Sequence, residues 1–238
     1  MTHAEILAAL FPTSHQVTVE GGRIHGDGPL RDGGTIQVLG VAHGTPLGVE
    51  DAAWLAGEVL GDRADRRPIL LMVDSGSQRM SRRDELLGIS EYLAHLAKSL
   101  LLAEAQGRRT IGLLYGHTAA GAFIATALAA GTLVALPGAE PEVMDLPSMA
   151  RVTKLPLEVL QEKAKATAVF APGLDNLAQT GAVLKSWDPA RPLDAQLAEF
   201  LSEPASGDQR DTLGKSRGGR PKAADIAARV FELATTAG

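Results

Sequence analysis

Three short apolar runs, each followed by a helical pattern, constrain the fold of this chain more than any other feature. The runs are TIQVLGVAHG (35–44), PILLMVDSG (68–76) and TIGLLYG (110–116). Runs this short and this apolar are typical of strands buried on both faces, and strands that alternate with helices usually pair in parallel. The sequence therefore predicts an α/β fold built from parallel strand and helix units.

The helical patterns that follow these runs cover residues 48–61, about 82–106 and 119–131. In the middle pattern Ser81 is placed to cap the start and Gly107 lies just past the end. Its apolar residues recur at three- and four-residue steps, which predicts one stripe facing the core: Leu86, Ile89, Leu93, Leu96 and Leu100. We expect a single long helix here.

The second half of the chain predicts two further strands and then mostly helices. The strand candidates are 132–138 and 141–146, and the segment 147–152 suits a helix start. Residues 203–221 are polar and rich in Gly and Pro, which favours a mobile linker. The last helix places its large apolar residues near one side, ready to dock on this chain or on a partner: Ile226, Val230, Phe231 and Leu233. We therefore predict a main domain over 1–202, a linker over 203–221 and a C-terminal helix within 222–238.

Composition excludes several classes of function. A chain of 238 residues fits one main domain, and its 23 basic and 28 acidic side chains give a formal charge of −5, which argues against nucleic-acid binding. With no cysteine there is no disulfide, thiolate nucleophile or Cys-based zinc site. The amino-terminal segment lacks the basic leader of a secretory signal, and no apolar run is long enough to span a membrane. We expect a soluble cytoplasmic protein.

The stretch LLYGHTAAGAFIATALAAG (113–131) runs from a strand through a glycine turn into small residues. The spacing of Gly116 and Gly121 resembles a phosphate-binding loop, but Ala122 and Phe123 stand where that loop needs Lys and Ser or Thr, so nucleotide binding is excluded. Small side chains at 119–122 would let a ligand approach backbone N–H groups at a helix start, where negative charge is favoured. Two interpretations stay open, an oxyanion hole and tight packing of the helix under a sheet.

A second turn, VDSGSQRMSRRDE (73–85), also follows a buried strand. Gly76 permits a tight turn and Gln78 offers a neutral amide as donor or acceptor. Ser75 and Ser77 do not form the G-x-S-x-G elbow, and no His is spaced to serve as their base. The pattern favours a hydrogen-bonding turn over a serine hydrolase.

The remaining titratable residues give weaker signals. Six histidines form no H-x-x-x-H or H-E-x-x-H pair, so a metal site is not expected, and only His117 lies inside a candidate turn. The carboxylates Glu85, Glu140 and Asp145 lie on different predicted elements, and their spacing does not mark an acid/base pair. The basic run near the C-terminus is typical of a solvated linker; the alternative is contact with an acidic partner or with the phosphate of a carrier prosthetic group: Lys215, Arg217, Arg220 and Lys222.

Five segments taken together resemble the γ subunit of biotin-independent malonate decarboxylase. They are GVAHGTPLGVEDAAWLA, VDSGSQRMSRRDELLGISEYLAHLAKSLLLA, YGHTAAGAFIATALAAG, LPGAEPEVMDLPSMARVTKLPLEVL and VFAPGLDNLAQTGAVLKSWD, which cover about residues 35 to 190 in order. The resemblance implies a crotonase-like ββα superhelix with a C-terminal helical extension. It also implies a β subunit as partner, the pair acting as a carbon–carbon lyase on malonyl held as a thioester by an acyl-carrier subunit.

In that family the products are the acetyl thioester and carbon dioxide, and a separate α subunit exchanges the acyl group. The resemblance implies no cofactor bound directly by this chain, because the carrier's phosphopantetheine-type group holds the substrate. Loss of carbon dioxide leaves a thioester enolate, whose oxygen is stabilised by backbone donors. The segment AAGAF (119–123) matches the turn that supplies such donors in the carboxyltransferase relatives.

The resemblance therefore assigns roles to particular residues. The catalytic candidates are the backbone groups of Gly121, Ala122, Ala120 and Gly116. The substrate-binding candidates are His117, Gln78, Gly76, Met149 and Ala150. Relatives often carry two adjacent glycines at the turn, whereas here Ala120 precedes Gly121, so the local backbone conformation is an open question.

Three alternatives remain at this stage. The chain is a structural or docking subunit whose partner carries the chemistry, or it is the α half of a biotin-dependent carboxyltransferase acting on acyl-CoA. A self-sufficient hydratase or thioesterase of the same fold would need a placed Glu or Asp base, and neither turn offers one.

Overall fold

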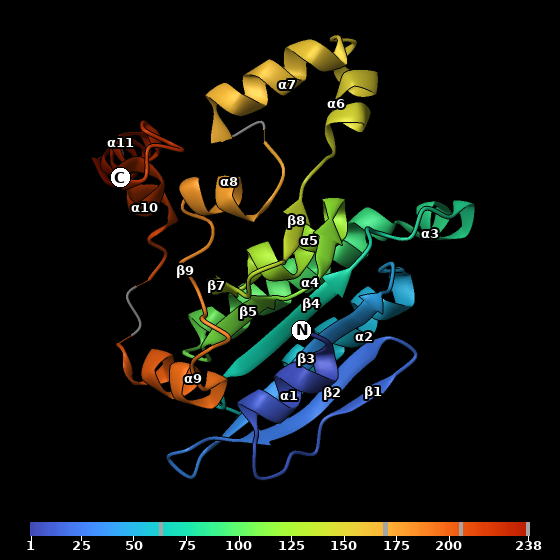
Figure 1. Ribbon diagram of the computed structural model, residues 1–238, viewed down its shortest axis with the longest axis vertical. Helices are drawn as coiled ribbons and strands as arrows, with labels where there is room; N and C mark the ends of the chain where they lie inside the picture. Colours follow the sequence, from blue (N-terminus) through green and yellow to red (C-terminus); the bar gives the residue numbers. More distant parts are fainter. Residues whose placement is uncertain (62–63, 169–170, 205–206, 237–238) are drawn as a thin grey trace.

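A seven-stranded sheet runs through the centre of the computed structural model, which describes residues 1–61, 64–168, 171–204 and 207–236 (Figure 1). Within these residues the strand order is β1-β2-β3-β4-β5-β7-β9. The first three strands pair antiparallel, and β3 and the strands beyond it pair in parallel. The bounds are β1 Thr18–Glu20, β2 Arg23–Pro29, β3 Thr35–Gly44, β4 Ile69–Ser75, β5 Thr110–Leu114, β7 Thr132–Ala135 and β9 Lys185–Ser186.

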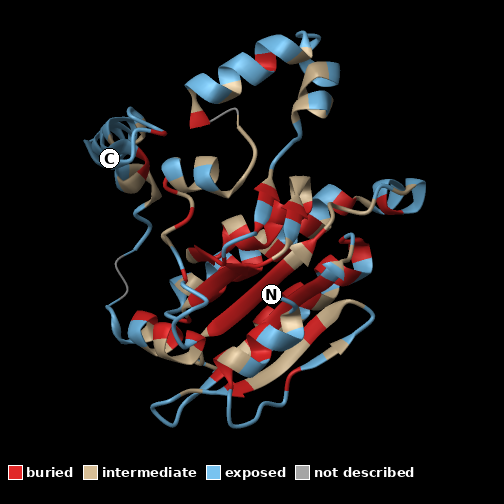
Figure 2. Ribbon diagram, viewed as in Figure 1, coloured by how far each residue is buried: buried red, intermediate tan, exposed pale blue. Residues whose placement is uncertain are grey.

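Both faces of the sheet are covered, as the apolar runs predict. Along β4 the residues Ile69, Leu71 and Val73 pack into one core cluster, while Leu70 and Met72 pack into the other, all fully buried. Helices α2 (Val49–Leu60) and α4 (Ile89–Ala105) contribute to the first cluster, and α1 (His3–Leu10) and α9 (Leu193–Ser202) to the second. Figure 2 shows these central strands as the most continuously buried part of the chain. Each such side chain stabilises the fold by about 1.5–3 kcal/mol.

The helix expected over 82–106 is wrong as one element, because the chain forms two. Helix α3 (Arg82–Leu87) ends at Gly88, whose φ of 81° is left-handed, and α4 starts at the next residue. Glycine adopts this conformation without the steric cost that other residues meet. Leu86 is 76% exposed, so it lies outside the buried stripe, whereas Leu93, Leu96 and Leu100 are buried as predicted.

The helix expected over 119–131 is also shorter than its pattern. Helix α5 covers Ala120–Ala125, and a short 3-10 turn, η1, follows at Ala127–Ala129. Helix α5 ends at Thr126, whose φ of −108° and ψ of −88° lie outside the helical region, and the Thr126 hydroxyl and N–H both donate to the carbonyl of Ala122. Before α5, strand β6 (His117–Ala119) pairs in parallel with β8 (Glu140–Glu142) as a small separate sheet. The strand predicted over 141–146 is thus shorter, and Asp145 instead caps helix α6.

Helices α6 (Leu146–Thr153) and α7 (Leu157–Ala166) form an arm that stands away from the central sheet (Figure 1). No residue of α6 is buried, and Leu160 is the buried residue of α7. The chain returns through α8 (Leu174–Gln179) to the last strand of the sheet. We call residues 146–166 the arm below.

Part of the predicted linker is a packed helix. Helix α10 (Arg210–Ser216) lies within 203–221, and Arg210 donates to the carbonyl of Leu128 at 2.9 Å. Arg217 donates to the carbonyls of Ala178 and Val183 at 2.8 and 2.6 Å. These arginines fix the segment on the main body, which its polar composition does not reveal. Residues 205–206 of the predicted linker and 237–238 of the predicted last segment lie outside the described residues.

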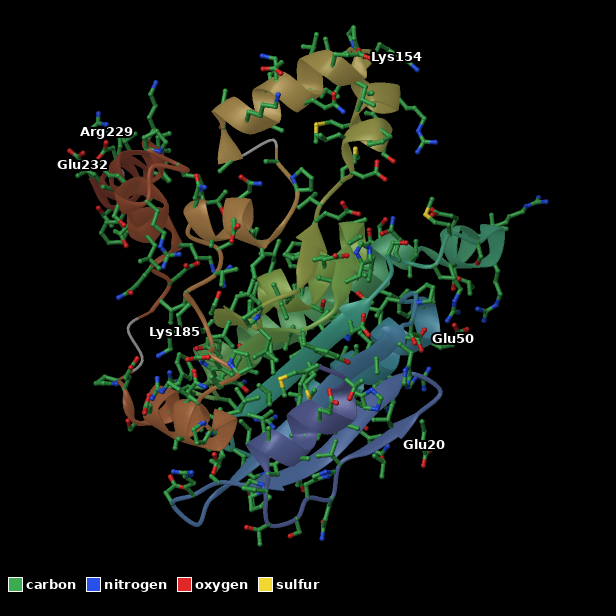
Figure 3. The ribbon with its side chains drawn as sticks, viewed as in Figure 1. Glu20, Glu50, Lys154, Lys185, Arg229 and Glu232 are labelled. Atoms are coloured by element: carbon green, nitrogen blue, oxygen red, sulfur yellow. The ribbon has the colours of Figure 1, made fainter. Side chains whose placement is uncertain are left out.

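The predicted last helix is present as α11 (Ala223–Thr236). Its apolar side chains are exposed, including Phe231 at 71% and Val230 at 60%. Figure 3 labels Arg229 and Glu232 on this helix, which pair with each other at 2.7 Å. Among the described residues no helix is both long and apolar enough to cross a membrane.

Candidate active site

Two turns meet beyond the carboxyl ends of β4 and β5, and they contain most of the residues that the sequence singles out. The hydroxyls of Ser75 and Thr118 share a buried hydrogen bond of 2.9 Å. The N–H of Gly121 donates to Oε1 of Gln78, also at 2.9 Å. The two turns are therefore held in contact at two points, although they lie far apart in sequence.

Gly116 begins the turn after β5 at a position that has no room for a side chain. A Cβ there would lie 2.3 Å from Oδ1 of Asp74, and the Gly116 carbonyl accepts the N–H of Glu140 at 3.0 Å. The preceding Tyr115 is buried and donates its hydroxyl to the carbonyl of Val41 at 3.2 Å. Burial, reinforced by the Asp74 carboxylate, raises the pKa of Tyr115, so this hydroxyl stays protonated.

The backbone of Ala120 adopts a conformation that favours glycine. Its φ is 52°, which is the left-handed region that glycine occupies freely. An L-residue there meets a steric cost of about 1–2 kcal/mol. The turn thus adopts the glycine-like conformation despite the alanine. Strained backbone of this kind occurs preferentially at functional sites.

Gly121 and Ala122 form the first turn of α5. A Cβ on Gly121 would lie 3.1 Å from both Oε1 of Gln78 and Cδ1 of Leu93, which is tighter than ordinary contact. Ala122 is fully buried. Of this pair the structure places Gly121 beside a polar side chain and Ala122 in the core cluster.

The turn after β4, which carries Gln78, is held from the loop between β3 and α2. Leu47 donates its N–H to the carbonyl of Ser77 at 2.9 Å and accepts the N–H of Arg79 at 2.6 Å, so the backbone of Gln78 is fixed on both sides. Gly76 donates its N–H to the carbonyl of Gly44 at 3.1 Å. Gln78 therefore projects from a rigid backbone toward Gly121.

A charged network anchors the same turn, and sequence reasoning missed it. Arg79 donates to Asp51 at 2.7 Å, and its guanidinium lies where a Cβ on Gly48 would be. Asp84, nearly fully buried, accepts the Ser81 hydroxyl at 2.7 Å and the N–H of Val49 at 3.3 Å. The Ser81 hydrogen bond is the main cause that lowers the pKa of Asp84. A signal for this network is present in the three arginines and one aspartate of residues 79–84, but their partners lie on α2.

Glu50, labelled in Figure 3, extends this network at the start of α2. It pairs with Arg83 and lies 3.3 Å from Arg79. The Arg83 hydrogen bond lowers the pKa of Glu50 to about 2. The network consequently joins α2 to the turn before α3.

The other sequence candidates lie farther from this contact. His117 is on β6 with its side chain 44% exposed, and its Nε2 is 3.9 Å from Oε1 of Glu142. Met149 and Ala150 are on α6, in the arm. Met149 lines a cavity of about 680 Å³ beneath the arm, and Gly121 and Gln78 are not among the lining residues. That cavity reaches the segment after β5 through Phe123 and Leu128, and the neighbouring strand β8 through Glu142.

Within the part of the chain that the structure describes, no three His, Cys, Asp or Glu side chains are grouped so as to hold a metal ion. Where the two turns meet, the backbone N–H of Gly121 donates to a side-chain carbonyl oxygen, Oε1 of Gln78. An arrangement of this kind can stabilise an oxyanion.

Comparison with known families decides the relationship of the chain. The family profile described as malonate decarboxylase gamma subunit, MdcE, matches residues 42–234. The chain belongs to the malonate decarboxylase gamma-subunit family. The matched range includes both turns of the site, and the family membership that the five segments predict is confirmed.

Similar proteins agree with this gamma-subunit assignment. The chain is 32% identical over 172 residues to the malonyl-S-ACP:biotin-protein carboxyltransferase MADD of Malonomonas rubra, covering 66% of this chain and spanning 58% of that relative's length. It is also similar to a chain of a Pseudomonas malonate decarboxylase hetero-tetramer in complex with coenzyme A, with a TM-score of 0.76, 25% identity and 98% of each chain covered.

A Pseudomonas MdcD–MdcE hetero-dimer is similar as well, with a TM-score of 0.73 and 25% identity over 95% of this chain and 96% of that chain. Transcarboxylase 12S shares the fold alone, at 17% identity and a TM-score of 0.67 over 85% of this chain and 40% of that chain. The crotonase-like carboxyltransferase fold predicted for this gamma-subunit family member is confirmed.

Proposed function

We propose that this chain is the γ half of a cytoplasmic malonyl-thioester decarboxylase. With a β subunit it converts malonyl-S-acyl-carrier protein into acetyl-S-acyl-carrier protein and carbon dioxide. The observation that carries the proposal is the Gly121 N–H, to which a carbonyl oxygen, Oε1 of Gln78, is already bound at 2.9 Å. A thioester carbonyl is an acceptor of the same kind.

In the proposed reaction the bond between the malonyl carboxylate and the methylene carbon breaks. Its electron pair moves into the thioester and leaves an enolate oxygen, while the carboxylate departs as carbon dioxide. The methylene carbon then takes up a proton to give the acetyl group. One preorganised donor facing the enolate oxygen is worth about 2.7–4 kcal/mol, or 10²–10³ in rate. We assign this donor to Gly121, with Ala122 as the adjacent amide.

The neighbouring residues shape the site in this proposal. The left-handed backbone at Ala120 sets the direction of the Gly121 N–H, and Gly116 lets the turn lie against Asp74. Gly76 and Gln78 form the opposite wall, and His117 lies at the rim. We place Met149 and Ala150 farther out. Met149 lines the cavity beneath the arm, where it would contact the phosphopantetheine-type group of the carrier.

The comparisons support the substrate class and the partners. MADD is named for an activity on malonyl-S-ACP, so a carrier-bound malonyl thioester is the natural substrate of this proposal. The Pseudomonas structures contain a hetero-dimer and a hetero-tetramer, which supports a β subunit as the direct partner. We further propose an acyl-carrier subunit with a phosphopantetheine-type group and an α acyltransferase subunit as the rest of the complex.

Reconstitution tests this proposal. Each subunit is purified alone and the two together, and carbon dioxide release from malonyl carrier protein is measured. We expect release from the pair and none from this chain alone. Release by this chain alone at the rate of the pair would contradict the proposal and favour a self-sufficient enzyme.

A second candidate, carboxyl transfer to a biotin protein, is favoured by the name of MADD. In that case the carboxyl group leaves the malonyl thioester but appears on biotin. Adding a biotinylated acceptor domain to the pair separates the two, since free carbon dioxide supports decarboxylation and carboxybiotin supports transfer.

A further inference from the structure

The Gln78 side chain occupies the place that the proposed function gives to the substrate. Its Oε1 accepts the Gly121 N–H at 2.9 Å, the donor that the decarboxylation needs. We propose that Gln78 is a reversible stand-in for the thioester oxygen, which it must yield when malonyl carrier binds. The inference rests on the proposed function and adds a positioning residue that regulates access to its donor.

The backbone of Gln78 is fixed, so only its side chain can move. Its neighbours Ser77 and Arg79 are both hydrogen bonded to Leu47. Arg79 is in turn paired with Asp51 at 2.7 Å. A rigid backbone delivers the amide oxygen to Gly121 at little entropic cost, which makes an effective internal competitor.

The amide head is weakly held on its other side. Its Nε2 donates to Sδ of Met80 at 3.7 Å, and sulfur is a weak acceptor. Met80 is itself 78% exposed. Rotation of the Gln78 side chain therefore costs chiefly its bond to Gly121, and the released amide can hydrogen bond to water.

A competitor of this kind lowers apparent substrate affinity by the fraction of molecules in which the donor is free. A net protein hydrogen bond shifts such an equilibrium by about two- to tenfold. The bond also keeps the Gly121 N–H oriented and shielded from water in the absence of substrate. Both effects can be measured separately.

The test uses Gln78→Met in the full chain paired with its β subunit. Methionine has nearly the length of glutamine but no oxygen to accept the N–H. We expect hydrogen exchange at the Gly121 amide to become faster by about two- to tenfold, and KM for malonyl carrier to fall by a similar factor. Acetyl-pantetheine, an unreactive thioester, should slow the exchange in the variant at a lower concentration than it needs in the wild type, where it must first displace the Gln78 oxygen.

Gln78→Glu is the matched variant, for which we expect the opposite changes in amide exchange and in KM. A carboxylate oxygen accepts the Gly121 N–H more strongly than an amide oxygen does, so exchange should become slower and KM should rise. Far-UV circular dichroism and gel filtration of both variants check that the pair still folds and assembles. Unchanged exchange in Gln78→Met, or a rise in its KM, would overturn the inference, because Gln78 would then be structural or a direct contact for substrate.

The exchange measurement needs no turnover, so it separates the inference from the proposed function. If the wild-type pair releases no carbon dioxide from malonyl carrier, the proposed function fails whatever the exchange shows. If the pair is active and acetyl-pantetheine occupies the Gly121 N–H at the same concentration in the wild type and in Gln78→Met, only the stand-in role fails.

Discussion

At the residue scale, Ala120 combines an alanine side chain with a backbone conformation that favours glycine. Its φ of 52° suits glycine, yet the residue is alanine. The contacts on either side hold the conformation: Thr118 is bonded to Ser75, and Gly121 is bonded to Gln78. The direction of the Gly121 N–H thus depends on two tertiary hydrogen bonds.

Ala120→Gly should therefore stabilise the chain. Glycine removes the left-handed strain of about 1–2 kcal/mol, against a loss of about 0.5–1 kcal/mol from its greater unfolded-state freedom. We expect a net gain of up to about 1.5 kcal/mol in denaturant unfolding, with turnover of the pair retained. Ala119→Gly is the control, since Ala119 has φ −138° and gains no relief, so it should destabilise. Equal destabilisation by the two variants would contradict the strained turn.

The contact between Gln78 and Gly121 marks the limit of sequence reasoning at this scale. The sequence predicts both turns as ligand-binding candidates, because each follows a buried strand. It does not predict that a side chain of one turn bonds to the backbone of the other, since that bond depends on the packing of α5 beside β4. The same holds for Asp84, whose buried carboxylate contacts α2.

At the scale of elements, the charged network between α2 and α3 predicts sensitivity to acid. Arg83 lowers the pKa of Glu50 from 4.5 to about 2, and the pKa of Asp84 is also lowered. As the pH falls, Glu50 therefore takes up its proton in the unfolded chain at a higher pH than in the folded chain. The stabilisation by this group is present above about pH 4.5 and is lost as the pH falls toward 2.

We expect the Tm of the chain to fall between pH 5 and pH 3, and Glu50→Gln to show a lower Tm at pH 7 but a shallower fall. The effect should shrink in 1 M salt, because Glu50 is 44% exposed and solvent-screened. Parallel curves for the variant and the wild type would show that the Glu50 pair does not contribute.

Helix α11 gives a second prediction at this scale. Its apolar residues Ile226, Val230 and Phe231 are more than half exposed, so they bury little surface on this chain. Deleting residues 222–238 should change the free energy of unfolding by less than about 0.5 kcal/mol, the range of surface changes. A Tm that drops by many degrees in differential scanning calorimetry would show that the helix is part of the core.

At the scale of the whole molecule, the sequence predicts the parallel centre of the fold well, and its edges poorly. The strands at 35–44 and 69–75 are visible because full burial selects unbroken apolar residues. The antiparallel hairpin of β1 and β2 is hidden, since those strands are half polar. The break at Gly88 is hidden as well, because the helical period continues across it. Arg210 and Arg217 anchor α10 through backbone carbonyls. The sequence places both in a polar linker, because their partners lie far away along the chain.

Turnover of the Gly121→Val pair tests the central claim most directly. Valine would add a branched side chain against the oxygen that the N–H binds, since even a Cβ there lies 3.1 Å from Oε1 of Gln78 and from Cδ1 of Leu93. We predict that kcat/KM for carbon dioxide release from malonyl carrier falls about 10²–10³-fold while the pair stays assembled. Gly57→Val, on α2 where a Cβ meets nothing within 4 Å, is the control and should stay within about twofold, as surface substitutions do. Undiminished turnover in an intact Gly121→Val pair would contradict the account and assign the chemistry to the partner subunit.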